Sequence, residues 1–234
     1  MIQDLPTYIS IVFGVTTILT LLMFYLAIRK SSAGDVTANR VLIVLTGWLI
    51  LQAAVTLNNF YSTDTTSLPP RIVFLVIPPL LTILLLFLTK HGRIFIDGLP
   101  QSTLTFMHIV RIPVELVLYW LFLHQAVPEL MTFSGRNFDI LAGITAPFVA
   151  YYGLQKQLMG RKTLITWNLV AMALLFNIVI HAVLSAPFAF QQLAFDQPNI
   201  AVLYFPFSWL PGFIVPVVLF SHLVSVRQLL KSEK

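Results

Sequence analysis

Apolar residues gather in long runs that short polar stretches separate. A helix needs about 20 apolar residues to cross about 30 Å of hydrocarbon, and the chain offers seven runs of that order. They cover residues 8–28, 41–61, 72–89, 104–127, 138–155, 163–190 and 200–226. In lipid each backbone must satisfy its own hydrogen bonds, so all seven are predicted to be helices. The connections are short, and residues 1–234 are therefore predicted to form a single all-α, seven-helix transmembrane domain.

Composition gives the same picture, because 58% of the residues are hydrophobic, only 10% are charged, and the mean hydropathy is +0.87. Soluble domains have roughly 25% charged residues. The sequence therefore predicts an integral membrane protein whose main partner is the lipid bilayer. The chain has no cysteine, which excludes disulfides, thiolate metal sites and cysteine nucleophiles.

The basic residues predict the orientation of the helices. Eleven of the 14 lysines and arginines fall on one side of the predicted spans, two fall on the other side, and Arg111 lies within a span. Basic loops stay in the cytoplasm, which places the N-terminus outside and the C-terminus inside a plasma (inner) membrane. Because topology explains most of the net charge of +5, no nucleic-acid partner is predicted. No basic residue precedes the first run, so it is expected to be a retained helix rather than a signal peptide.

The stretch FMHIVRIPVELVLYWLF, residues 106–122, places charges inside the fourth span. Arg111 and Glu115 are one helical turn apart and are predicted to form an ion pair. His108 and Tyr119 share their face of the helix. A charged side chain at mid-bilayer costs at least about 2.5–3.5 kcal/mol, so this face is expected to point into the bundle or a wet cavity.

Polar residues on other predicted helices could meet this charged face. Gln52 and Asn59 belong to one face of the second span, and Asn177 and His181 are one turn apart in the sixth. The leading hypothesis is a small-solute or proton-coupled transporter, in which Glu115 titrates and Arg111 holds its charge or an anionic substrate. The predicted path is lined by His108, Arg111, Glu115, Tyr119, Gln52, Asn59, Asn177 and His181.

Two alternatives stay open at this point. Paired histidines at matching depths can hold haem, which would make the chain an electron-transfer subunit, although His108 and His124 point about 160° apart on one helix. The other alternative is a non-catalytic membrane partner or sensor with a structural Arg111–Glu115 pair. The loop charges, Asp139 among them, are expected to be solvated. No catalytic motif or metal spacing is visible, which favours a non-enzymatic protein without deciding the question and predicts no metal and no cofactor other than haem.

A weak internal repeat relates the first three spans to the last three. Trp48 and Asn58 recur at the same spacing as Trp167 and Asn177. Three helices, a linker helix and three helices is an arrangement that resembles sugar and amino-acid carriers. The proline–glutamine signature of those carriers is missing from the first and fifth spans, so the sequence is assigned to no family.

Overall fold

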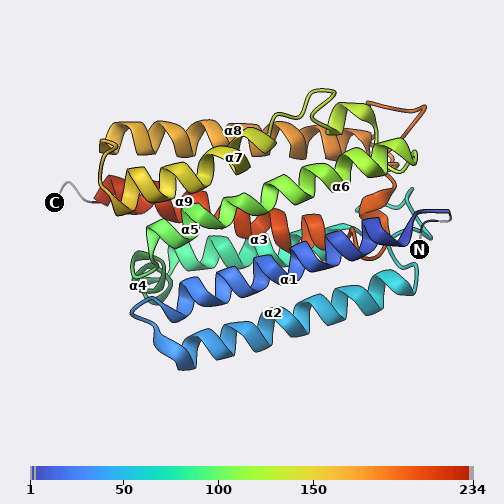
Figure 1. Ribbon diagram of the computed structural model, residues 1–234. Coiled ribbons are helices and arrows are strands. Elements are labelled where there is room, and N and C mark those ends of the chain that lie inside the picture. Colours follow the sequence, from blue (N-terminus) through green and yellow to red (C-terminus); the bar gives the residue numbers. More distant parts are fainter. Residues whose placement is uncertain (1, 3, 232–234) are drawn as a thin grey trace.

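The computed structural model describes residues 2 and 4–231, and these form an all-α bundle without a strand. Figure 1 shows the long helices lying roughly along one common direction. The elements are α1 (Thr7–Arg29), α2 (Gly34–Leu57), α3 (Val73–Leu88), α4 (Lys90–Asp97), α5 (Gln101–Met107), η1 (His108–Val110), α6 (Arg111–Leu123), η2 (Glu129–Met131), α7 (Ile140–Phe148), η3 (Val149–Gln155), α8 (Arg161–Ser185), η4 (Ala201–Leu203), η5 (Leu210–Ile214) and α9 (Val215–Lys231).

Five helical stretches in the described part of the chain are long and apolar enough to cross a membrane. They are 7–29, 34–57, 101–123, 161–185 and 210–231. A sixth is added if α3 and α4, which meet at a bend of 92°, count as one broken span. The stretch Ile140–Gln155 is apolar but shorter than the others. The membrane-protein class predicted from the sequence is thus supported, while the count of seven stays a prediction.

Several predicted boundaries were wrong where polar or proline-containing segments interrupt the apolar runs. The second span ends at Leu57, and Asn59 has a left-handed backbone with φ of 57°. The last span begins at Leu210, ten residues after the predicted start, because residues 186–209 contain several prolines and form mostly turns. In contrast, the connection left between the predicted runs 72–89 and 104–127 is largely helical, because it contains α4 and the start of α5.

Two tryptophans tie the outer helix α2 to the start of the last span. Pro216 has no backbone N–H, so it cannot bond the carbonyl of Gly212 four residues earlier. The indole Nε1 of Trp48 donates to this carbonyl at 2.9 Å. In return, Trp209 Nε1 donates to the Leu49 carbonyl at 3.0 Å. The irregular π-helical turn η5 is thereby fixed against α2.

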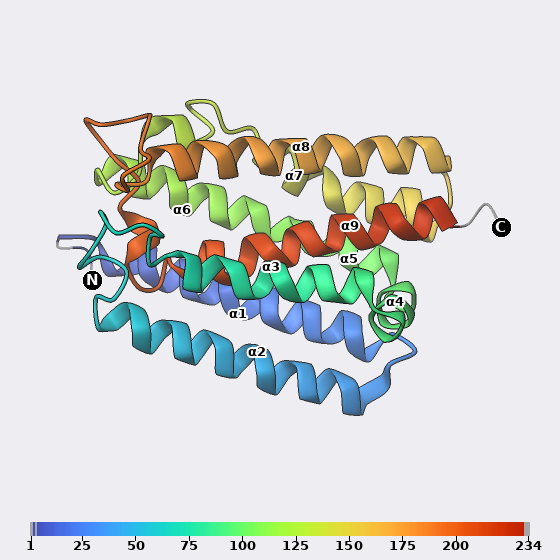
Figure 2. The same cartoon turned by 180° about the vertical axis from the view of Figure 1, so that it is seen from behind.

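The continuous stretch α5–η1–α6 lies inside the bundle, together with α1 and α9, whereas α2 and α8 are more exposed. Gly143 of α7 lets that helix approach closely, since a Cβ there would lie 3.2 Å from the Arg111 Cβ. Figures 1 and 2 show α4 and the C-terminal end of α9 at one end of the bundle, and the N-terminus with the loop after α6 at the other. These contacts place the charged stretch of residues 111–115 against α7, α8 and α9.

Candidate functional site

Arg111 is the centre of a buried polar network, with a side chain only 3% exposed. Its Nη1 donates to the Ala171 carbonyl of α8 at 3.2 Å. The same atom lies 3.1 Å from Asp139 Oδ1 and forms an ion pair with it that is not a hydrogen bond. Its Nη2 lies 3.0 Å from His222 Nε2 of α9. The guanidinium thus joins α8 and α9 to the segment before α7.

These contacts determine which nitrogen of His222 holds the proton. A guanidinium can only donate hydrogen bonds, so His222 Nε2 must accept from Arg111. His222 Nδ1 then donates to Asn168 Oδ1, 2.9 Å away. Asn168 Nδ2 in turn donates to the Leu164 carbonyl at 2.9 Å. The chain of donors and acceptors is complete only with a neutral imidazole.

Glu115 has a different set of contacts. Its Oε1 accepts a hydrogen bond of 2.6 Å from Asn137 Nδ2, and that amide also donates to the Met131 carbonyl at 3.0 Å. Asn137 Oδ1 accepts from the Asp139 backbone N–H at 3.0 Å, so one asparagine links both carboxyl-bearing residues. Glu115 Oε2 is buried and has no hydrogen-bond partner among the described residues.

The predicted Arg111–Glu115 ion pair was wrong. Within the part of the chain that the structure describes, the counterion of Arg111 is Asp139. The prediction that Asp139 is solvated was also wrong, because this side chain is only 7% exposed. The small side chains of α7, Ala142, Gly143 and Ala146, are buried against the bundle and bring Asp139 next to Arg111. Those small residues were the available sequence signal for this approach.

His108 lies beside the network rather than within it. Its ring stacks on His222 with 3.8 Å between centroids and 14° between planes, and Trp167 packs against both rings. Both His108 ring nitrogens are buried without a hydrogen-bond partner among the described residues. Two stacked imidazoles do not direct their nitrogens at one common atom. No group of three or more histidine, aspartate or glutamate side chains in the described chain could hold a metal ion.

Three other predicted site residues are half-buried on α6 and α8 and are separate from the charged network. Asn177 Nδ2 donates to the Arg136 carbonyl at 2.8 Å, and His181 Nδ1 bonds the Asn177 carbonyl at 2.8 Å. Tyr119 stacks on Phe133, with 4.9 Å between ring centroids. Asn177 and Tyr119 hold the loop after α6 against the bundle, whereas the His181 bond lies within α8. None of the three is hydrogen-bonded to Arg111 or Glu115 in the described structure.

The two predicted residues of α2 are also separate from the charged network. Gln52 is buried and accepts a hydrogen bond from the Tyr61 hydroxyl, while the nearby Thr56 bonds Ser208 at 3.0 Å. Asn59 is exposed beyond the end of α2. The prediction that Asn59 shares the helical face of Gln52 was wrong because the helix ends at Leu57.

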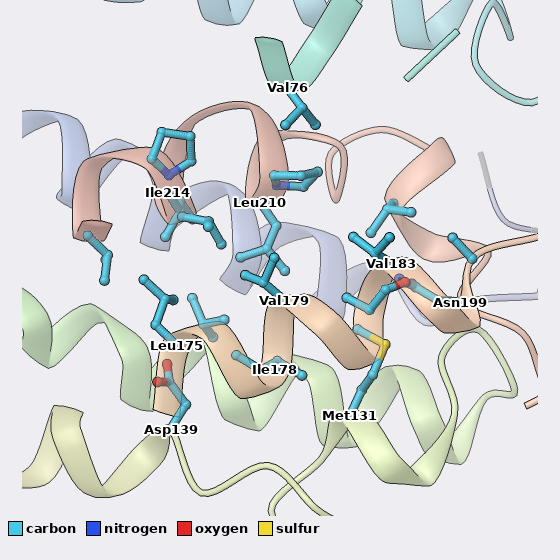
Figure 3. A pocket seen from close by; sticks show the side chains of 18 of the residues that line it. Val76, Met131, Asp139, Leu175, Ile178, Val179, Val183, Asn199, Leu210 and Ile214 are labelled. Carbon is cyan, nitrogen blue, oxygen red and sulfur yellow. The ribbon is translucent and has the colours of Figure 1, made fainter. Parts of the chain in front are cut away.

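A cavity of about 260 Å³ adjoins the network. Most of its wall consists of apolar side chains from α3, α6, α8, the η5–α9 stretch and the segment after α8. The polar lining residues are Arg111, Glu115, Asp139 and Asn199. Figure 3 shows Asp139 beside Leu175 at one end and Asn199 near Val183 at the opposite end, with apolar residues between them. The unpartnered oxygen of Glu115 therefore belongs to a side chain that lines a mainly apolar chamber.

The cavity lies within the part of the chain that matches a known family. The family described as Domain of unknown function (DUF8737) matches residues 69–230. The chain belongs to this family. Every residue that lines the cavity falls inside the matched range, as does the network from His108 to His222, whereas α1 and α2 precede it. No curated protein and no solved structure matches the chain.

Proposed function

We propose that this protein is a membrane carrier that moves a small solute through the cavity, with Glu115 as the group that binds it. The observation that carries the proposal is the buried Glu115 Oε2, which has no partner among the described residues and belongs to a cavity-lining side chain. An unpaired buried acceptor costs about 1–3 kcal/mol. Ionisable groups at membrane depth are commonly retained where they act on a substrate or a proton.

The proposal includes seven spans in the plasma membrane, with the N-terminus outside. Figure 1 supports it by placing α4, the α1–α2 connection and the C-terminal end of α9 at one end of the bundle. Together with the η3–α8 connection at the same end, these segments and the adjoining helix ends contain most of the lysines and arginines, and basic segments stay in the cytoplasm. In the proposed orientation α4, which meets α3 at a bend of 92°, is an interfacial helix along the cytoplasmic surface.

The charges of the network suggest how a solute and a proton could exchange. One arginine faces two carboxyls, so the cluster is neutral only when one carboxyl holds a proton or when a cation binds. A net charge is expensive in a medium of low dielectric constant. A proton and a cationic solute would therefore compete for the same place, the free side of Glu115.

Reconstitution in proteoliposomes tests the carrier function. Hexylguanidinium or hexanoate is added outside, and a trapped pH-sensitive dye records protein-dependent proton movement. We expect one of the two solutes to give a flux that Glu115→Gln abolishes. Glu129→Gln, the same substitution at an exposed position, should leave the flux unchanged. A flux from neither solute, or an undiminished flux in Glu115→Gln, would refute the carrier function.

A second candidate, a membrane sensor or partner, is favoured by one observation. Both terminal nitrogens of Arg111 are engaged, which suits a structural role for this residue. If the ligand binds but no flux is found, the chain would be a binding protein rather than a carrier.

A further inference from the structure

Hydrogen-bond acceptors without partners are distributed over the cavity wall. Glu115 Oε2 and Asn199 Oδ1 are buried and make no hydrogen bond to any described residue. Asp139 Oδ1 is also buried without a hydrogen bond, but it is ion-paired with Arg111 Nη1 at 3.1 Å. The amide of Asn199 is already used, because its Nδ2 donates to the Ala182 carbonyl at 3.1 Å. A ligand that satisfies this wall must therefore donate hydrogen bonds.

Charge selects the ligand further. Among the described residues, the charged groups that interact electrostatically with Glu115 are Asp139 and Arg111. His222 is hydrogen-bonded to Arg111. Arg111 Nε lacks a partner and could donate to an anion, but the same guanidinium already faces two carboxyls. An anionic ligand would bring a third negative charge into a buried cluster with one positive charge. A cation would complete the charge balance instead.

The rim of the cavity indicates the rest of the ligand. Leu80 of α3 and Phe176 and Val183 of α8 line the cavity and are themselves exposed on the bundle surface. Figure 2 shows α3 and α8 with α9 running between them. A protein of this composition presents such surface to lipid, so these rim residues of α3 and α8 face the acyl chains. A molecule that enters there must have an apolar body.

We propose that the cavity binds a cationic amphiphile, an apolar molecule that ends in a protonated amine or a guanidinium. The cationic head donates hydrogen bonds to Glu115 and Asp139, and the apolar body lies along α8 between the α3 and η5–α9 side chains. This proposal rests on the proposed function only in its use of Glu115 as the binding group.

Binding to the purified full chain in lipid nanodiscs tests the ligand class. Hexylguanidinium, 1-hexanol and hexanoate share one tail and differ in the head group, and empty nanodiscs correct for partition into lipid. We expect hexylguanidinium to bind at least tenfold more tightly than hexanoate, with 1-hexanol between them. Glu115→Gln should weaken hexylguanidinium binding at least tenfold, and Glu129→Gln should not change it.

A second variant, Val183→Trp, tests the location of the ligand even if Glu115→Gln does not fold. Val183→Trp fills the exposed rim of the cavity without touching the charged network, so it should weaken binding of all three compounds and leave the melting temperature unchanged. Hexanoate binding as tightly as hexylguanidinium would overturn the proposed ligand class, and full binding by Val183→Trp would overturn its location. Neither result would refute the carrier function. A flux of hexanoate that Glu115→Gln abolishes would still support it. Selective binding without flux would uphold the ligand class and refute the carrier.

Discussion

Replacing Asp139 by Asn and Glu115 by Gln, singly and together, tests whether the two carboxyls share the neutralisation of Arg111. Both substitutions keep the shape of the side chain and remove its negative charge. Asp139 lies 3.1 Å from the guanidinium, while Glu115 acts on it from beyond ion-pair distance. Each single variant therefore leaves one carboxyl to balance Arg111, and only the double variant leaves a buried arginine without any counterion.

The expected magnitudes follow from this redundancy. Single hydrogen bonds inside membrane proteins contribute about 0.6 kcal/mol on average and at most about 1.7 kcal/mol. Each single variant should thus lower the free energy of unfolding by about 1 kcal/mol. Removing every partner of a buried charge costs about 3–5 kcal/mol. The double variant should lose that much, so the coupling energy between Asp139 and Glu115 should be about 1–3 kcal/mol.

Reversible unfolding in mixed micelles, followed by tryptophan fluorescence, measures these free energies. The exposed pair Asp196→Asn and Glu129→Gln provides a matched control that removes the same two kinds of charge, and its effects should be small and additive. Additive losses from Asp139→Asn and Glu115→Gln would show that the two carboxyls do not share Arg111. A single Asp139→Asn loss as large as that of the double variant would show that Asp139 alone balances the arginine.

Three further results are expected. Hexylguanidinium affinity should fall as the pH is lowered, because a proton then occupies the carboxyl that the cation needs, and titration calorimetry at two pH values measures it. Trp48→Phe should destabilise the protein by about 0.5–1.5 kcal/mol in the same unfolding assay, since it leaves the Gly212 carbonyl without its donor, whereas Trp120→Phe serves as a control for loss of indole size. Asp97→Asn removes the ion pairs of Asp97 with Arg227, at 2.7 Å, and with Lys231, at 2.6 Å. It should lower stability by about 1 kcal/mol or less, and the loss should be smaller at high salt.

The membrane class of the fold could be predicted because hydrocarbon imposes a length and a composition on each helix. The ends of the helices could not, because they depend on local backbone features rather than on hydropathy. Asn59, for example, is in a left-handed conformation that ends α2 four residues before the apolar run ends. The stretch 200–209 is apolar enough to resemble an α-helix, yet its backbone forms only the short 3-10 helix η4 followed by turns.

For the site, the sequence identified the charged helix but not the partners of its charges. Helical spacing brings Arg111 and Glu115 to one face, and this spacing was the basis of the predicted pair. The partners instead come from Asn137 and Asp139, more than twenty residues away, and from His222 at the other end of the chain. Which distant side chain meets a buried charge depends on how closely the helices pack, and here the absence of a side chain at Gly143 decides it.

The network divides into a part that holds the bundle together and a part that remains open. Arg111 bonds α8 and α9 through its two terminal nitrogens, and Asn137 uses both its amide and its carbonyl. Glu115 is bonded through one oxygen only.

Buried polar groups in native proteins are nearly always satisfied, and the exceptions call for a specific explanation. A leucine at position 115 would remove the cost of the unpaired oxygen, so a purely structural role does not account for this carboxyl. The proposed ligand would account for it, because a cationic donor at the free side of Glu115 would supply both the missing hydrogen bond and a balancing positive charge.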